Sequence, residues 1–186
     1  LCNGRRPSLC VSGINFMENV GHGIYASGTI AAALEAADRG IPAIAVSQQL
    51  PPKANRPTDF DGLREMFTIA GKIAARFGKD IITNGLIDKR RFCLNVNVPA
   101  GATLDTPIVY ANIAPNRLWE WLPFEREDKS LPGRLEYGIA SETSHEPNDD
   151  TYELHENGNV TVTALTSNMQ DFSVDIGAIE ALFDKR

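Results

Sequence analysis

The chain has 186 residues, of which 42% are hydrophobic and 23% are charged, and its formal net charge is −6. This length and composition suit one well-cored globular domain with a smaller appendage, and they exclude a disordered chain, a collagen and a coiled coil. The negative net charge disfavours non-specific binding to a nucleic-acid polymer, which needs a positive surface, although a helix N-terminus or a metal ion can still hold a small phosphate ester.

The chain contains three cysteines, Cys2, Cys10 and Cys93, which lack metal-ligand spacing and cannot all pair with one another. Unpaired cysteines favour a reducing compartment, so a cytoplasmic location is predicted. No apolar run approaches the roughly 20 residues that cross a bilayer, and no signal-peptide pattern is present, so we expect no membrane partner. Because the chain begins with Leu1 instead of Met and soon enters an internal-looking strand, we expect a fragment or a processed product.

Residues 9–47 predict a strand, a loop, a helix and a second strand. The apolar run at 8–12 is too short for a helix. The helix is expected over residues 27–39, where apolar side chains recur at helical spacing and Gly40 closes the pattern. A strand at 41–46 follows, and a strand–helix–strand unit of this length implies a right-handed parallel crossover.

Residues 58–99 continue the same pattern. Thr58 is the expected N-cap of a second helix over residues 59–77, and Gly78 is expected to end that helix. The strand expected at 91–99 alternates and so places four apolar side chains on one face, namely Phe92, Leu94, Val96 and Val98. We therefore predict an α/β core over residues 1–99, a Rossmann-like, mostly parallel sheet with helices on both faces.

Beyond residue 100 the sequence is richer in Pro, Gly, Asn and charged residues, which predicts a β-rich C-terminal extension over residues 100–186. Its expected elements are β-like runs at 107–113 and 134–139, a hairpin turning at Asn157-Gly158 between residues 152–155 and 160–165, and a helix at 174–183. Asn-Gly between two such runs is a strong hairpin signal.

The loop after the first strand carries the residues that point to chemistry. Residues 12–15 lie at the C-terminal end of that strand, and ligands of open α/β sheets bind in the crevice beyond such ends. Ser27, Gly28 and Thr29 open the following helix, where free N–H groups, two hydroxyls and the positive dipole end suit a phosphate. The structural alternative stays open, because Ser and Thr before a helix are commonly only caps and Gly-rich turns only turns.

Generic nucleotide motifs do not choose between these interpretations. The loop contains neither a Walker A motif nor a Gly-x-Gly-x-x-Gly fingerprint, which disfavours a dinucleotide-binding domain. His22 is either an acid–base candidate or an exposed, inert loop residue. Trp119, Trp121 and Phe124 either stack on a nucleobase or, as we favour, pack in a hairpin or a subunit interface.

Several ordered segments of the sequence form one larger pattern. They are SGIN (12–15), followed by Asn19-Val20-Gly21, then YASGTIAAA (25–33), GIPAIAVS (40–47), LNVNVP (94–99) and VTVTAL (160–165). Together they resemble the SurE (survival protein E) family of 5'/3'-nucleotidases over roughly residues 9–166. Departures from the family pattern are Met17 in place of a loop glycine, Ala26 inserted before Ser-Gly-Thr, and Ala164 in place of a proline.

The resemblance implies a metal-dependent phosphatase that hydrolyses nucleoside 5'- or 3'-monophosphates. Its divalent ion, Mg²⁺ or Mn²⁺, would be held by an adjacent aspartate pair, a loop serine and the SGIN asparagine. Only the asparagine, Asn15, is present here, and the aspartates, which are also the catalytic candidates, would lie upstream of this chain, leaving the α/β core incomplete. The residues implied to bind phosphate are Asn19, Ser27, Gly28 and Thr29, although Asn19 could instead orient the loop.

Two further expectations complete this set. The adjacent aspartates Asp149 and Asp150 are interpreted as a solvated loop and not as a replacement for the missing pair. SurE proteins assemble through their C-terminal extensions, which implies a homodimer or homotetramer formed by residues 100–186. An alternative of a different class is a non-catalytic phosphate- or nucleotide-binding module on the same scaffold.

Overall fold

The computed structural model describes residues 4–84, 93–116, 118–122, 136–139 and 146–168. In chain order its elements are β1 (Cys10–Phe16), η1 (Gly21–Ala26), α1 (Gly28–Asp38), β2 (Ala43–Gln48), η2 (Lys53–Asn55), α2 (Phe60–Asn84), β3 (Cys93–Val98), β4 (Ile108–Tyr110), β5 (Trp119–Leu122), β6 (Glu136–Ile139), α3 (Asp150–His155) and β7 (Val160–Leu165). The predicted positions of Phe92 and of a helix at 174–183 lie outside the described residues.

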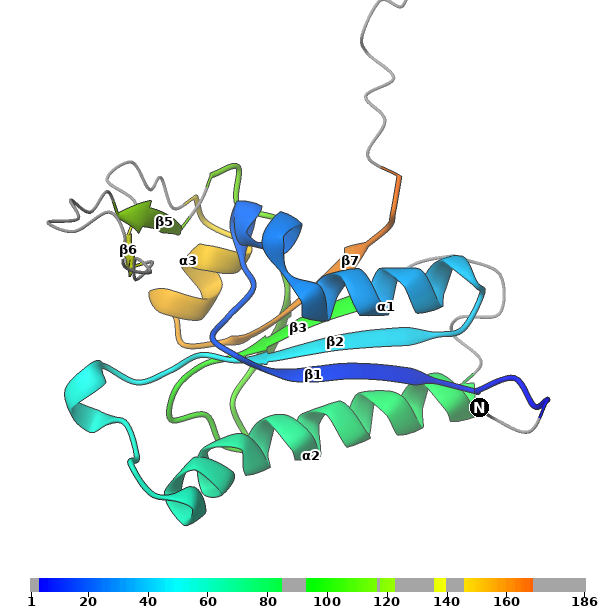
Figure 1. The fold of residues 1–186 in the computed structure, drawn as a ribbon, viewed down its shortest axis with the longest axis horizontal. Coiled ribbons are helices and arrows are strands. Elements are labelled where there is room, and N and C mark those ends of the chain that lie inside the picture. Colours follow the sequence, from blue (N-terminus) through cyan, green and yellow to red (C-terminus); the bar gives the residue numbers. More distant parts are fainter. Residues whose placement is uncertain (1–3, 85–92, 117, 123–135, 140–145, 169–186) are drawn as a thin grey trace, which may run out of the picture.

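The main sheet has five strands in the order β1-β2-β3-β7-β4. β1, β2 and β3 run parallel, β7 is antiparallel to β3, and β4 is parallel to β7. α1 covers one face of the sheet and α2 covers the other (Figure 1). The predicted α/β fold class, with a mostly parallel sheet between helices, is therefore confirmed. Because β4 and β7 join this sheet, it extends past residue 99, while the two-domain division at that residue stays a prediction.

The two faces of the sheet are packed differently. On the α2 face, four β-branched side chains of β2 and β3 are fully buried, namely Ile44, Val46, Val96 and Val98. On the α1 face the packed layer is built largely of alanines, namely Ala33, Ala36, Ala37, Ala43 and Ala45. Small side chains let α1 approach the sheet closely, which holds the start of this helix near the end of β1.

β1 is longer than predicted, because it runs through the whole SGIN segment to Phe16. Its register with β2 shifts between Ser12 and Asn15. Gly13 lies in this irregularity with a φ of +122°, and a Cβ atom there would collide with the carbonyl oxygen of Val46. Glycine is therefore required at this position, and the bulge sets the point at which Asn15 reaches the end of the strand.

α2 also runs past its predicted end. Its N-cap is Asp59 and not Thr58, because Asp59 Oδ1 accepts the N–H of Gly62 at 2.7 Å. Gly78 does not end the helix but lies buried within it, where the Leu9 side chain would be only 2.8 Å from an added Cβ atom. Glycine at this position allows α2 to pack closely on Leu9, just before β1, a contact that local sequence does not reveal.

The predicted hairpin at Asn157-Gly158 is wrong, since the segment before it forms the helix α3. Gly158, with a φ of +65°, lies in the connection from α3 to β7. The Asn157 side chain donates to Glu153 Oε2 at 3.0 Å, so this turn is tied to the helix that precedes it. The antiparallel pair in this part of the chain is instead β5 with β6.

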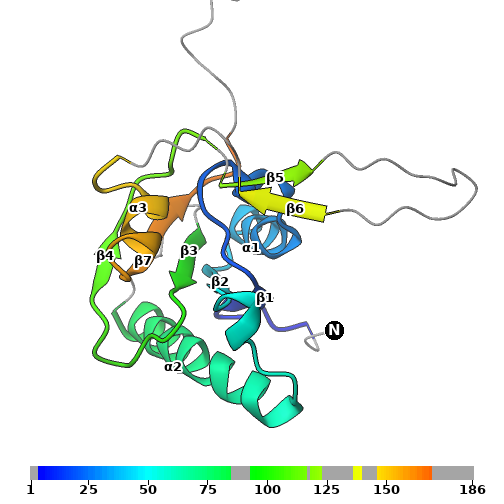
Figure 2. The same ribbon diagram turned by 90° about the vertical axis from the view of Figure 1, so that its left-hand side faces the viewer.

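α3, β5 and β6 gather at the end of the sheet where β1, β2 and β3 finish, on the same side as α1 (Figures 1 and 2). These three elements therefore lie beside the carboxyl ends of the parallel strands. Within the described ranges, no helix has both the length and the apolar character needed to span a membrane.

Candidate functional site at the carboxyl edge of the sheet

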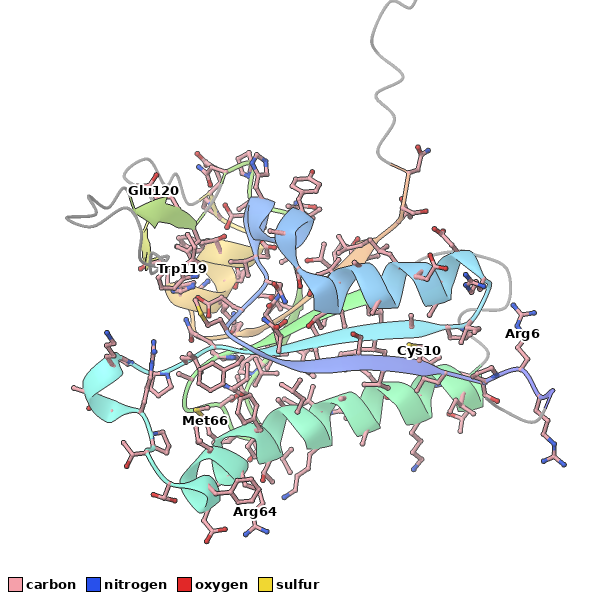
Figure 3. The ribbon with its side chains drawn as sticks, viewed as in Figure 1. Arg6, Cys10, Arg64, Met66, Trp119 and Glu120 are labelled. Atoms are coloured by element: carbon pink, nitrogen blue, oxygen red, sulfur yellow. The ribbon has the colours of Figure 1, made fainter. Side chains whose placement is uncertain are left out.

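A cavity of about 480 Å³ opens at the carboxyl end of β1. It is lined by the end of β1, the loop after β1, η1, the start of α1 and one residue of β5: Asn15, Phe16, Met17, Glu18, Asn19, His22, Gly23, Tyr25, Ala26, Ser27, Gly28 and Trp119. Figure 3 shows Trp119 at this end of the molecule, between β5 and the ends of the parallel strands. The volume is that of a small-molecule site, for which about 300–1,000 Å³ is usual.

The first turn of α1 brings hydrogen-bond donors to this cavity. Ser27 is the N-cap, and its Oγ accepts the N–H of Ile30 at 3.2 Å, which leaves the hydroxyl proton available to donate. The N–H of Ala31 bonds to the Ser27 carbonyl at 3.0 Å. In the described part of the chain, the N–H groups of Gly28 and Thr29 have no partner. The Ser27 hydroxyl, the Gly28 N–H and the positive helix end therefore lie at one cavity, as an anion site requires, whereas Thr29 does not line it.

Asn15 reaches the same cavity from the end of β1. Its Oδ1 accepts the hydroxyl of Thr29 at 3.2 Å, and its Nδ2 donates to the carbonyl of Met17 at 2.7 Å. The structure brings the predicted metal ligand, Asn15, to one cavity with three of the four predicted phosphate-binding residues, namely Asn19, Ser27 and Gly28. Thr29 holds Asn15 through its hydroxyl. The roles of all these residues in ligand binding stay predictions.

Asn19 also lines the cavity, but a buried polar network holds it in place. Asn97 Oδ1 accepts the Asn19 N–H at 2.7 Å, and Asn97 Nδ2 donates to the Asn19 carbonyl at 3.2 Å. Asn95 Nδ2 donates to the same carbonyl at 2.8 Å, and Asn19 Nδ2 donates to Ser47 Oγ at 2.8 Å. Of the two roles considered for Asn19, these contacts favour orienting the loop.

Sequence reasoning missed the part that Asn95 and Asn97 play. Both side chains are 0% exposed and project from the same face of β3 toward the loop after β1. A signal was available, because two amides at alternate positions of a buried strand must be hydrogen-bonded. Their partner, 76 and 78 residues earlier in the chain, could not be found without the fold.

Met17 has a φ of +102°, in the region that glycine favours, at the position where the SurE pattern carries a loop glycine. Its N–H donates to the carbonyl of Gln48 at 3.1 Å, which fixes the backbone there. We expect Met17→Gly to be more stable than Met17→Ala by about 1 kcal/mol, because both lose the side chain but only glycine adopts this φ without strain. Urea denaturation of the two variants measures the difference, and equal midpoints would contradict the left-handed conformation.

Asp149 and Asp150 do not form the solvated loop that was expected, because both are buried. Asp149 caps α3 by accepting the N–H of Tyr152 at 2.6 Å. Asp150 accepts the N–H of Gly21 at 3.1 Å on each oxygen and that of Ala114 at 2.9 Å. The pair therefore fastens α3 to the start of η1 and to the segment before β5, which is a structural role.

The stability of this part of the protein is expected to depend on pH through Asp150. Burial raises its pKa to about 6, against the opposing effect of the hydrogen bonds from Ala114 and Gly21. Because the folded protein binds this proton more tightly than the unfolded chain does, the contribution to stability falls as pH rises from about 4 to about 6. We expect the wild type to lose about 2 kcal/mol over this window relative to Asp150→Asn, which does not titrate. Guanidinium denaturation of both proteins across the window checks this, and a constant difference would contradict it.

The described residues do not by themselves fit a divalent cation. At the cavity they offer the neutral Oδ1 of Asn15, which already accepts a hydrogen bond from Thr29, and a single carboxylate, Glu18, whose Oε1 accepts from Trp119. No group of three or more His, Cys, Asp or Glu side chains is placed to hold a metal ion in the described ranges. Hard cations such as Mg²⁺ take several oxygen ligands, usually including carboxylates.

Two aromatic candidates also lie at the cavity. The His22 ring centroid is 5.7 Å from that of Tyr25, and both residues line the cavity. Trp119 belongs to the β5–β6 pair, packs against the cluster of Val20, Leu118 and Leu154, and also borders the cavity. The packing expected for Trp119 is therefore present, and it does not exclude contact with a ligand. Phe124 and the Trp121 side chain lie outside what the structure describes.

Taken together, these observations define an α/β protein with a cavity at the carboxyl edge of a mostly parallel sheet, lined in part by the first turn of α1. The family model described as "Survival protein SurE" matches residues 1–120. The 5'-nucleotidase SurE of Methanocella arvoryzae is 33% identical over 168 residues, covering 89% of this chain and 61% of that protein. The 5'-nucleotidase SurE of Methanothrix thermoacetophila is 33% identical over 188 residues, covering 98% of this chain and 68% of that protein.

A solved structure agrees with these sequence relatives. The crystal structure of the SurE protein from Aquifex aeolicus matches with a TM-score of 0.65 and 27% identity, covering 98% of this chain and 68% of that one. The chain belongs to the SurE family. It spans 61% and 68% of the two relatives described above, so it corresponds to about two thirds of their length.

Proposed function

We propose that this chain is part of a phosphatase that hydrolyses nucleoside 5'-monophosphates to nucleoside and phosphate. The observation that carries the proposal is the single cavity that Asn15, Ser27 and Gly28 line at the first turn of α1. The cavity has room for a nucleoside as well as a phosphate group. Relatives that carry the name 5'-nucleotidase SurE support the choice of substrate.

The residues of this chain act on the phosphoryl group. The Ser27 hydroxyl and the N–H groups of Gly28 and Thr29 bind its oxygens, and the helix dipole favours their negative charge. Because Ser27 caps α1 and the Thr29 hydroxyl is bonded to Asn15, these donors are held in place before the substrate arrives. Donors that are already oriented stabilise a transition state without reorganisation, which is the main electrostatic contribution expected of this chain.

The proposal extends to 3'-monophosphates and to a divalent cation, Mg²⁺ or Mn²⁺. It rests on the family resemblance and on the amide oxygen of Asn15, which is of the type that hard cations accept. Since the described residues do not complete a cation site, we propose that carboxylate ligands and the catalytic aspartates come from residues outside this sequence.

Assembly and location are proposed in the same way. We propose a homodimer or homotetramer formed through residues 100–186, for which the separate two-stranded sheet of β5 and β6 offers support. We propose a cytoplasmic location, which the free thiols of Cys10 and Cys93 support.

An assay of the full-length protein tests the proposal against its alternative. With Mg²⁺ or Mn²⁺ present, we expect release of phosphate from AMP and GMP, and loss of that release in EDTA. The alternative, a phosphate- or nucleotide-binding module without catalysis, draws support from the incomplete cation site of the described residues. Binding of AMP without hydrolysis under any metal condition would favour the module, and activity indifferent to EDTA would contradict the metal dependence.

A further inference from the structure

The cavity is also lined by a buried carboxylate, that of Glu18, which has no role in the proposed reaction. The Glu18 side chain is 2% exposed, and the residue lines the cavity. Its Oε1 accepts the indole N–H of Trp119 at 3.1 Å and lies 3.3 Å from Nε2 of His155. A carboxylate is costly to bury unless donors surround it, and these two donors come from β5 and α3.

The contacts behind His155 fix the geometry of this cluster. Gln49 Oε1 accepts the N–H of Ala100 at 2.9 Å, which turns the Gln49 amide nitrogen toward the His155 ring, 3.2 Å from Nδ1 and 3.4 Å from Nε2. One tautomer of His155 satisfies both neighbours, with Nδ1 accepting from Gln49 and the Nε2–H donating to Glu18. The loop after β1, the loop after β2, α3 and β5 are thus tied together at Glu18.

The indole of Trp119 is held from two directions. Glu18 binds its ring nitrogen, and the cluster of Val20, Leu118 and Leu154 packs against the same residue. Trp119 borders the cavity that Ser27 and Gly28 also line. The cavity therefore combines phosphate-type donors from α1 with a fixed, flat aromatic ring from β5.

We propose that Glu18 is a positioning residue, which holds the Trp119 indole as the wall of the cavity on which the nucleobase stacks. The inference rests on the proposed function and adds to it the chemical class that the cavity prefers, a phosphate ester carrying a flat aromatic ring. Stacking tolerates any base, because every base presents a π-face. The bases of AMP, GMP and a pyrimidine nucleotide therefore all stack on the Trp119 indole, whereas ribose 5-phosphate has no base to stack on it.

Steady-state kinetics of the full-length protein on AMP and on ribose 5-phosphate test this inference. Trp119→Leu and Glu18→Ala are expected to raise KM for AMP roughly tenfold, with kcat within about twofold of wild type and KM for ribose 5-phosphate little changed. Glu18→Gln is expected to stay near wild type, because its amide oxygen can accept from both Trp119 and His155. Tyr110→Leu, which replaces a 68% exposed aromatic residue on β4, serves as the matched control.

The outcomes separate the two proposals. Wild-type protein that hydrolyses AMP, with variants that raise KM equally for both substrates or for neither, would overturn the stacking wall and leave the nucleotidase in place. Such a result would make Trp119 a packing residue only. A wild type that hydrolyses no phosphate monoester under any metal condition would overturn the proposed function, and this inference with it. If Glu18→Gln raised KM for AMP as much as Glu18→Ala does, Glu18 would not be a positioning residue for Trp119.

Discussion

Replacing Asn15 by alanine in the full-length protein is expected to lower kcat for AMP by about 100-fold or more while the fold stays intact. Asn15 accepts the Thr29 hydroxyl and donates to the Met17 carbonyl, so it joins the first turn of α1 to the loop after β1. Its loss removes an oxygen from the proposed reaction site and releases both Thr29 and Met17. The effect should fall on turnover more than on stability, because the side chain is only partly buried.

The matched control is Asn55→Ala, which changes an exposed asparagine in η2, outside the cavity. Phosphate release from AMP measures the effect, and thermal unfolding followed by circular dichroism confirms that each variant is folded. An Asn15→Ala variant with the rate of wild type would remove Asn15 from the site.

Replacing Asn97 by aspartate is expected to cost about 4 kcal/mol of unfolding free energy at neutral pH, against about 2 kcal/mol for Asn97→Ala. Asn97 donates from Nδ2 to the Asn19 carbonyl and accepts the Asn19 N–H on Oδ1, at a position that is 0% exposed. In the alanine variant the Asn19 N–H loses the acceptor that Asn97 supplies, and the Asn19 carbonyl loses one of its two amide donors. The aspartate variant, in addition, sets a buried negative charge against a carbonyl oxygen.

The two variants should also differ in their response to pH. Burial raises the pKa of a carboxyl group, and the protonated form can donate to the Asn19 carbonyl as the amide does. The penalty of Asn97→Asp should therefore shrink as pH falls through that raised pKa, whereas the penalty of Asn97→Ala should not change. Urea denaturation over a range of pH measures both. Equal pH profiles would contradict a direct contact between Asn97 and the Asn19 carbonyl.

The elements with strong local signals could be predicted from the sequence. α1 follows from helical spacing and from Ser27, which does cap it, and β2 and β3 follow from short apolar runs bounded by proline or glycine. The predicted end of α2 at Gly78 was wrong, because this glycine allows a close contact with Leu9, in the segment leading into β1, and does not end the helix. A glycine that allows packing and a glycine that ends a helix look the same in a sequence.

The prediction of a hairpin at Asn157-Gly158 was wrong for a related reason. Asn157-Gly158 does lie at a turn, but the residues before it are committed to α3 by the Asp149 cap and by the burial of Asp150 and Leu154. The turn signal is local, whereas the choice between helix and strand for the preceding segment depended on tertiary contacts. Those contacts include Asp150 with Gly21, which lie 129 residues apart.

The candidate site was predicted in part. Ser27, Gly28 and Thr29 could be named from their place at the start of a helix, whereas Asn15 and Asn19 were named through the resemblance to SurE proteins. Of these five residues, all but Thr29 line one cavity. Asn97, Glu18 and His155 could not be named, because each gains its meaning from a partner in another element. The polar residues that hold a loop against a sheet are found only once the sheet order is known.

The central claim is that a phosphate group binds at the first turn of α1. A crystal structure of the full-length protein with AMP, prepared in EDTA to prevent turnover, tests it most directly. We expect phosphate oxygens about 3 Å from the Ser27 hydroxyl and from the Gly28 N–H. AMP bound with its phosphate away from α1, or bound outside this cavity altogether, would contradict it.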